Sequence, residues 1–175
     1  LRSGRKVILA SPRKHLLYNK YSQHLSDNLH LYRYQGDKKR YFENTGNTEK
    51  DILAFNDELG RYVQSGGRKI LTTYDSLGKI VEVLLNSGEC LQEWIVVVDE
   101  FQSIFCDCQY KATTEYEFSM ILGMFSTVVY LSATPFLESY LDMTGQFGGL
   151  TVYELLWPAN MTQIPEGEGI RSRKS

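Results

Sequence analysis

Two adjacent carboxylates, Asp99 and Glu100, are the sharpest chemical feature of the sequence. They follow residues 94–98, an apolar run that predicts a strand buried on both faces. Such a strand would deliver both carboxylates to the mouth of a low-dielectric site, where they repel each other unless a cation or hydrogen bonds compensate. Mg²⁺ is the natural cation for hard oxygen ligands. Capping of a following helix is the alternative, and the pair by itself favours capping.

Polar side chains also follow three other predicted strands. These stretches are residues 11–13, 72–76 and 132–135, and they contribute hydroxyls and one guanidinium. Ligands of open α/β sheets bind beyond the carboxyl ends of the strands. We therefore expect the acidic pair and these three stretches to lie along one edge of a sheet.

The pattern of apolar residues predicts alternating strands and helices. Strands are expected over 6–10, 29–34, 69–73, 94–98, 127–131 and 150–156, and helices over 15–29, 51–64, 75–86, 113–125 and 136–143. Asp51 is the expected cap of the second helix, and residues 35–50 are an expected loop. The order predicts an α/β domain over 1–160 with a mainly parallel sheet. Residues 161–175 are an expected polar tail or linker.

Composition predicts a soluble, cytoplasmic domain with no membrane partner. The chain has 175 residues, of which 42% are hydrophobic, enough to bury a core. No apolar run approaches the length of a bilayer span, and the amino end lacks the pattern of a signal peptide. Three cysteines do not suit a disulfide scaffold. Because there is no initiator Met, we expect the chain to be a piece of a longer polypeptide.

The net charge of -2 hides two unlike halves. Residues 1–79 carry 15 basic and 8 acidic side chains, a net of +7, whereas residues 80–175 carry 4 basic and 13 acidic ones, a net of -9. Such a split predicts two surfaces with different partners, a polyanion for the first half and a metal cation for the second.

The ordered strand ends resemble a known family. Residues 96–102, which contain Asp99-Glu100-Phe101-Gln102, and residues 128–135, which contain Ser132-Ala133-Thr134, resemble motifs II and III of superfamily 2 helicases of the DEAD-box-like group. Residues 7–13 look like motif Ia, and residues 70–77 resemble the T-T-x-x-S-L stretch that precedes motif II. The resemblance covers residues 6–135.

That resemblance implies the first RecA-like domain, a three-layer α/β fold that is here incomplete at its N-terminus. It implies Mg²⁺ and ATP as cofactors and DNA or RNA as the partner of the basic half. Asp99 would hold the metal and Glu100 would activate water, while Gln102, Ser132 and Thr134 would couple hydrolysis to movement. The residues that would lie against the nucleic-acid backbone are Ser11, Arg13, Thr72, Thr73 and Ser76.

Two parts of such an enzyme are missing from the sequence. No G-x-x-x-x-G-K-[ST] phosphate loop occurs, and the second RecA-like domain is absent. Phosphoryl transfer depends on the charge and positioning that the loop supplies. We therefore expect neither tight cofactor binding nor ATP hydrolysis by this chain alone, and robust Asp99-dependent turnover would contradict this expectation.

Two other functions fit parts of the pattern. The first is a helicase-derived domain that has lost catalysis and binds nucleic acid or protein. A metal-dependent nuclease that uses Asp99, Glu100, Asp107 and Glu115 ranks last, because residues 132–134 would have no role in it.

Several further features are interpreted as structural. Cys106 and Cys108 lack partner ligands for zinc and are read as free cysteines. The three histidines are expected on surfaces, and the basic and aromatic run 38–42 is expected to be a solvated loop rather than a nucleic-acid contact. The expected core aromatics are Phe118, Phe125 and Tyr130.

Overall fold

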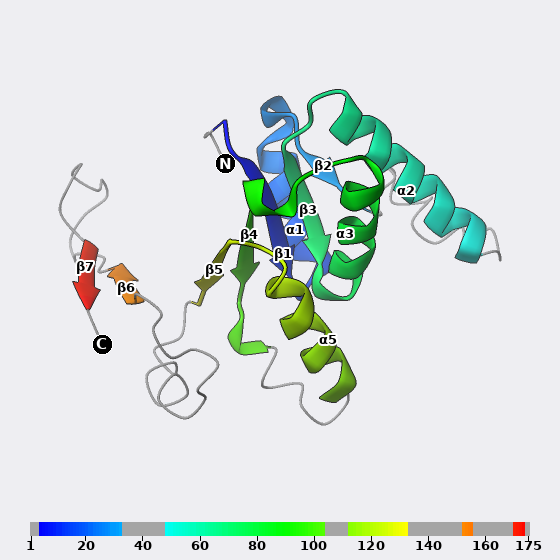
Figure 1. Ribbon diagram of the computed structural model, residues 1–175. Helices are drawn as coiled ribbons and strands as arrows, with labels where there is room; N and C mark the ends of the chain where they lie inside the picture. Colours follow the sequence, from blue (N-terminus) through cyan, green and yellow to red (C-terminus); the bar gives the residue numbers. More distant parts are fainter. Residues whose placement is uncertain (1–3, 33–47, 104–111, 133–151, 156–169, 174–175) are drawn as a thin grey trace. The chain divides into compact units, whose positions relative to one another are not determined.

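The computed structural model describes residues 4–32, 48–103, 112–132, 152–155 and 170–173 (Figure 1). The chain divides into two compact units, residues 1–133 and 134–175. The strands of the first unit are β1 (Lys6–Ser11), β2 (His30–Leu31), β3 (Lys69–Thr73), β4 (Trp94–Asp99) and β5 (Thr127–Leu131). Its α-helices are α1 (Lys14–Gln23), α2 (Thr48–Gln64), α3 (Leu77–Asn86) and α5 (Ala112–Leu122).

The five strands of the first unit form one parallel sheet in the order β2-β3-β1-β4-β5. This confirms the predicted α/β class and the predicted direction of the strands. The bounds of β3 and β5 coincide with the predicted ones, because each run of branched apolar residues stops at a polar or glycine-containing segment.

Helices cover both faces of the sheet, which gives a three-layer α/β fold. The crossover from β1 to β2 runs in the opposite direction across the sheet from the other three crossovers. Since such crossovers are right-handed, α1 lies on one face and α2, α3 and α5 lie on the other (Figure 1). The α1 face packs Leu17 against Leu9 and Leu71. None of the described helices combines the length and apolar character that a membrane span requires.

The cover over the α1 face is incomplete. Side chains of β4 alternate between buried and half-buried, and Val129 and Leu131 of β5 are 40% and 42% exposed. The prediction that residues 94–98 are buried on both faces is therefore wrong for one face. The reason is that α1 packs on β1, β2 and β3, while β4 and β5 lie beyond it.

The predicted helix bounds need three corrections. The helix predicted over 15–29 ends at Gln23, and a 3₁₀ turn (Leu25–Asp27) and Asn28, with a left-handed φ of 49°, follow it. The second helix begins at Thr48, so Asp51 lies inside it and is not its cap. α5 stops at Leu122, three residues before the predicted end.

The second unit contains β6 (Val152–Leu155) and β7 (Ile170–Arg173), which pair antiparallel. The strand predicted over 150–156 therefore exists but does not join the parallel sheet. Its partner lies in the segment predicted to be a polar tail, where Ile170 is the lone apolar residue of the strand. Three of the predicted features lie outside the described residues: residues 35–47 of the predicted loop, the helix over 136–143, and the cysteines at 106 and 108. The last three residues of the predicted loop, 48–50, belong to α2.

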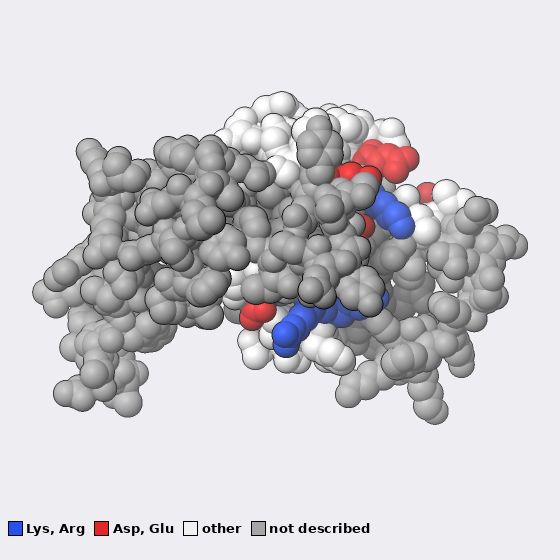
Figure 2. Space-filling view, turned by 90° about the horizontal axis from the view of Figure 1, so that it is seen from below, with Lys and Arg blue, Asp and Glu red and all other residues white. Residues whose placement is uncertain are grey.

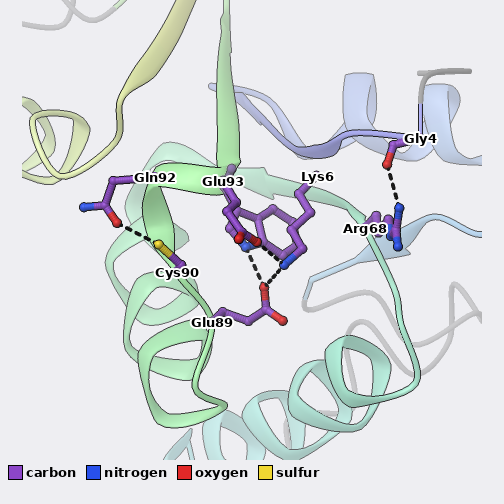
Figure 3. Close-up of polar contacts among 8 residues, drawn as sticks. Gly4, Lys6, Arg68, Glu89, Cys90, Gln92 and Glu93 are labelled. Atoms are coloured by element: carbon purple, nitrogen blue, oxygen red, sulfur yellow. Dashed lines mark hydrogen bonds and ion pairs between the residues drawn. The ribbon is translucent and has the colours of Figure 1, made fainter.

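An ion-pair cluster joins β1 to the start of β4 at the amino-terminal edge of the sheet (Figure 3). Lys6 Nζ lies 2.6 Å from Glu89 and 2.7 Å from Glu93, and Trp94 Nε1 donates a hydrogen bond of 3.0 Å to Glu89. The side-chain hydrogen bonds to Glu89 and Glu93 raise the pKa of Lys6. Burial opposes ionisation of Glu89, but the bonds from Lys6 and Trp94 outweigh it and lower its pKa.

His30 is buried in β2, so the prediction that it lies on the surface is wrong. Its ring stacks on Tyr62 with centroids 5.0 Å apart, and its Nε2 atom has no hydrogen-bond partner. Tyr62 is itself held because its hydroxyl donates to the carbonyl oxygens of Asn28 and Lys69. Burial lowers the pKa of His30 to about 4, so the folded protein keeps this imidazole neutral.

Protonation of His30 is expected to destabilise the fold in mild acid. An unfolded histidine binds a proton near pH 6.5, whereas the folded one resists to about pH 4, so the unfolded state binds more protons between these values. Stability should fall across this window, by up to roughly 3 kcal/mol in the free energy of unfolding. Urea denaturation between pH 4 and pH 7 would measure it, with His30→Leu expected to show a shallower pH slope. Equal slopes would contradict the assignment.

Candidate functional site

The carboxyl ends of the central strands place four residues in one row across the sheet. Ser11 pairs with Thr73 in the register of β1 and β3, and Asp99 pairs with Leu131 in the register of β4 and β5. Ala10 pairs with Val98, so Ser11 and Asp99 are the next positions along β1 and β4. The sheet topology therefore brings these strand ends together at one edge, as predicted.

This edge contains the point at which the connections diverge. The chain leaves β1 toward α1 on one face and leaves β4 toward α5 on the other. In open α/β sheets, ligands bind at such a divergence, beyond the carboxyl ends of the strands. Figure 2 views the molecule from the side to which the strands point, and both basic and acidic side chains are visible on that side.

Asp99 is held by an ion pair that the sequence analysis did not foresee. The Lys20 Nζ atom of α1 donates to Asp99 Oδ2 at 2.6 Å. Alternate residues of β1 and β4 face α1, and Asp99 lies on the same face as Val97, which packs against the α1 cluster. The carboxylate is 16% exposed and the Lys20 side chain 36% exposed, so the pair is partly shielded from water.

The main chain at Asp99 is fixed by a second residue, Tyr74. Its hydroxyl donates a short hydrogen bond to the backbone carbonyl oxygen of Asp99. Burial raises the pKa of Tyr74, which keeps its hydroxyl protonated as a donor. The ring packs on Phe118 of α5 with centroids 4.9 Å apart. Tyr74 directly follows β3, so it links the hydroxyl-bearing end of that strand to the acidic pair.

Glu100 has a left-handed backbone conformation, with φ of 54°. A residue with a Cβ atom adopts this backbone conformation at a steric cost in free energy, and residues strained in this way concentrate at functional sites. Three bonds hold the turn: the Glu100 carbonyl oxygen accepts from Ser103 N at 2.9 Å and from Ser103 Oγ at 2.5 Å, and Phe101 N donates to the Leu131 carbonyl oxygen at 3.2 Å. The turn therefore has a fixed backbone directly after Asp99.

Neither carboxylate caps the turn that follows in the described residues. The hydrogen bond of the Asp99 side chain goes to Lys20, and no bond from the Glu100 side chain to a backbone amide is present in this part of the chain. Capping of amides beyond residue 103, the alternative that the pair by itself favoured, concerns residues outside the described ones.

The five residues predicted to lie against nucleic acid differ in accessibility. Ser11 and Thr72 are fully buried and Ser76 is 4% exposed, whereas Thr73 is half-buried and Arg13 is exposed. Thr73 Oγ1 donates to Ser76 Oγ at 3.2 Å, and Ser11 Oγ is buried without a hydrogen-bond partner. In this conformation Arg13 and Thr73 are the members of the set that a phosphate can reach.

The predicted coupling residues are described in part. Gln102 is half-buried, and its Oε1 atom has no hydrogen-bond partner. Ser132 is half-buried at the end of β5, one position after Leu131 in the row. Thr134 lies outside the described residues. Two buried polar atoms near the acidic pair therefore have no hydrogen-bond partner. Ser11 Oγ lies at the end of β1, the strand beside β4, and Gln102 Oε1 belongs to the turn after β4.

The described residues supply part of a metal site. They contain no group of three or more His, Cys, Asp or Glu side chains arranged to hold a metal ion. Asp99 and Glu100 offer hard oxygen ligands, which suit Mg²⁺ when phosphate oxygens and water complete its coordination. Of the nuclease ligands considered from the sequence, Asp107 and the side chain of Glu115 lie outside the described residues.

Lys20 and Tyr74 are the residues that sequence reasoning missed. Lys20 lies seven residues after Arg13, two helical turns along α1, but no local pattern points from it to the end of β4. Tyr74 stands within the predicted hydroxyl-rich stretch, yet its aromatic ring gave no reason to place it under the acidic pair. Comparison of the chain with models of protein families, with curated proteins and with solved structures gave no match.

The left-handed backbone of Glu100 can be tested by substitution. The free energy of unfolding should be about 1 kcal/mol higher for Glu100→Gly than for Glu100→Ala, because glycine adopts this φ without steric cost. Both variants lack the carboxylate, so the difference isolates the backbone. Chemical denaturation measures it. A Glu100→Ala variant as stable as Glu100→Gly would show that the turn is unstrained.

Proposed function

We propose that this chain is part of an ATP-dependent nucleic-acid helicase or translocase of superfamily 2, with a RecA-like fold. The observation that carries the proposal is the position of Asp99 and Glu100. They stand at the carboxyl end of β4, beside the point at which the connections diverge, in a row with the hydroxyls of Ser11 and Thr73.

In this function the two carboxylates have different tasks. Asp99 would hold Mg²⁺ bound to ATP, and the metal would neutralise charge on the phosphates. Glu100, which follows Asp99 in a left-handed backbone conformation, would orient and deprotonate the attacking water. Gln102, Ser132 and Thr134 would transmit the nucleotide state, and exposed Arg13 with Thr73 would contact phosphates of DNA or RNA without reading sequence.

A non-catalytic nucleic-acid or protein-binding module is the second candidate. The Lys20–Asp99 ion pair favours it, because a protein cation already neutralises the carboxylate that would hold the metal. The third candidate, a metal-dependent nuclease, gains no support from the described residues, which hold no third acidic ligand near the pair.

The decisive measurement is nucleic-acid-stimulated ATP hydrolysis by the longer polypeptide to which we expect the chain to belong. Glu100→Gln should lower turnover at least about 100-fold while ATP binding is retained, because it removes the base and keeps the shape. Glu82→Gln is the matched control, since it removes the same charge from an exposed position of α3.

An unchanged rate in Glu100→Gln would remove Glu100 from the catalytic role. Absence of hydrolysis in the wild-type polypeptide, together with nucleic-acid or protein binding, would favour the non-catalytic module.

A further inference from the structure

We propose that the Lys20 ammonium is a displaceable counter-ion of Asp99: it occupies the carboxylate when no divalent cation is bound and is released when one binds. The inference rests on the metal-binding role proposed for Asp99. It adds a regulatory residue to the site, since Lys20 would set how tightly the site holds a divalent cation.

The anchoring of the two partners is unequal. Asp99 belongs to β4, whose neighbours β1 and β5 pair with it on both sides, and its carbonyl oxygen accepts the Tyr74 hydroxyl. Lys20 belongs to α1, which is fixed by Leu17, a fully buried side chain one turn earlier. The ammonium itself is held by its bond to Asp99 at the end of a flexible four-carbon stem.

Release of Lys20 therefore requires rotation of one side chain rather than movement of an element. The Lys20 side chain is 36% exposed, more than twice the exposed fraction of Asp99, so its ammonium can return to water while Leu17 keeps the helix in place. The Asp99 carboxylate, in contrast, stays at the carboxyl end of β4, because β4 is paired on both sides and Tyr74 binds the Asp99 carbonyl oxygen.

The ammonium and a divalent cation compete for this carboxylate. Lys20 Nζ lies 2.6 Å from Asp99 Oδ2, which is the contact distance of an ion pair, so a cation that approaches this oxygen meets the ammonium. The two positive charges would also repel each other across the same partly shielded site. Binding of a divalent cation must then include the free energy of breaking the ion pair, so removal of the lysine charge should tighten metal binding.

The test is titration of this chain with Mn²⁺ alone, with free Mn²⁺ measured by its electron paramagnetic resonance signal. Lys20→Met should bind Mn²⁺ about two- to fivefold more tightly than wild type, the range expected for loss of a partly exposed competing ion pair. Methionine keeps the helix propensity and the length of the stem. Circular dichroism confirms that each variant is folded.

Two further variants make the result specific. Lys14→Met removes the same charge from an exposed position of the same helix and should bind as wild type does. Asp99→Asn combined with Lys20→Met should abolish the gain. In the folded chain, Mn²⁺ should also broaden the amide signals of residues 99–101 at lower concentration in Lys20→Met than in wild type.

The outcomes separate this inference from the proposed function. Asp99-dependent binding of equal strength in wild type and Lys20→Met would overturn the counter-ion role and leave the metal role of Asp99 standing. Lack of Asp99-dependent Mn²⁺ binding in every variant would overturn the counter-ion role in this chain, while the metal role proposed for Asp99 together with ATP would still be decided by the ATP hydrolysis assay.

Discussion

The position of β1 between β3 and β4 is the constraint on which the rest of the structure depends. β1 is first in the chain but central in the sheet, so the chain must run outward from it in one direction and return to the other side. Right-handed crossovers then force α1 onto the face opposite α2, α3 and α5. The divergence of the chain beyond the ends of β1 and β4 follows from that arrangement, and so does the approach of Lys20 on α1 to Asp99.

The same pairing gives a physical meaning to the uneven charge. The basic half of the sequence contains β1 and α1, and the acidic half contains β4 and the turn before it. Lys6 pairs with Glu89 and Glu93 at one end of these adjacent strands, and Lys20 pairs with Asp99 at the other. Each of these ion pairs joins the +7 half to the -9 half, so part of the imbalance is neutralised inside the fold and is not offered to partners.

Much of the fold followed from the sequence because its signals are local. Residues 69–73 and 127–131 are short runs rich in β-branched and apolar residues. The turn-forming residues that bound each run suffice to place the two strands. Burial was less predictable, since it depends on what covers a strand. Val97 is half-buried because α1 packs mainly on β1, β2 and β3 and covers β4 only in part, and His30 is buried because Tyr62 stacks on it from a helix more than thirty residues later in the chain.

The candidate site shows the same division. Asp99, Glu100 and the hydroxyls could be named from the sequence because strand ends of a parallel sheet must meet at one edge. Their contacts could not, since Lys20 and Tyr74 reach Asp99 from elements separated from it by 79 and 25 residues.

The conformation and contacts of the acidic pair go beyond what the end of a strand requires. An acidic residue that merely terminates a strand or begins a helix can do so with an ordinary φ and with its carboxylate on a backbone amide. Here Glu100 has a positive φ, Asp99 is bound by a lysine from another layer, and Ser11 Oγ beside it is buried without a partner. The positive φ of Glu100 and the unpaired hydroxyl of Ser11 each have a cost to stability. Under the proposed function, a cation and a polyanion bound at this end of the sheet would supply partners for these groups and would compete with Lys20 for Asp99.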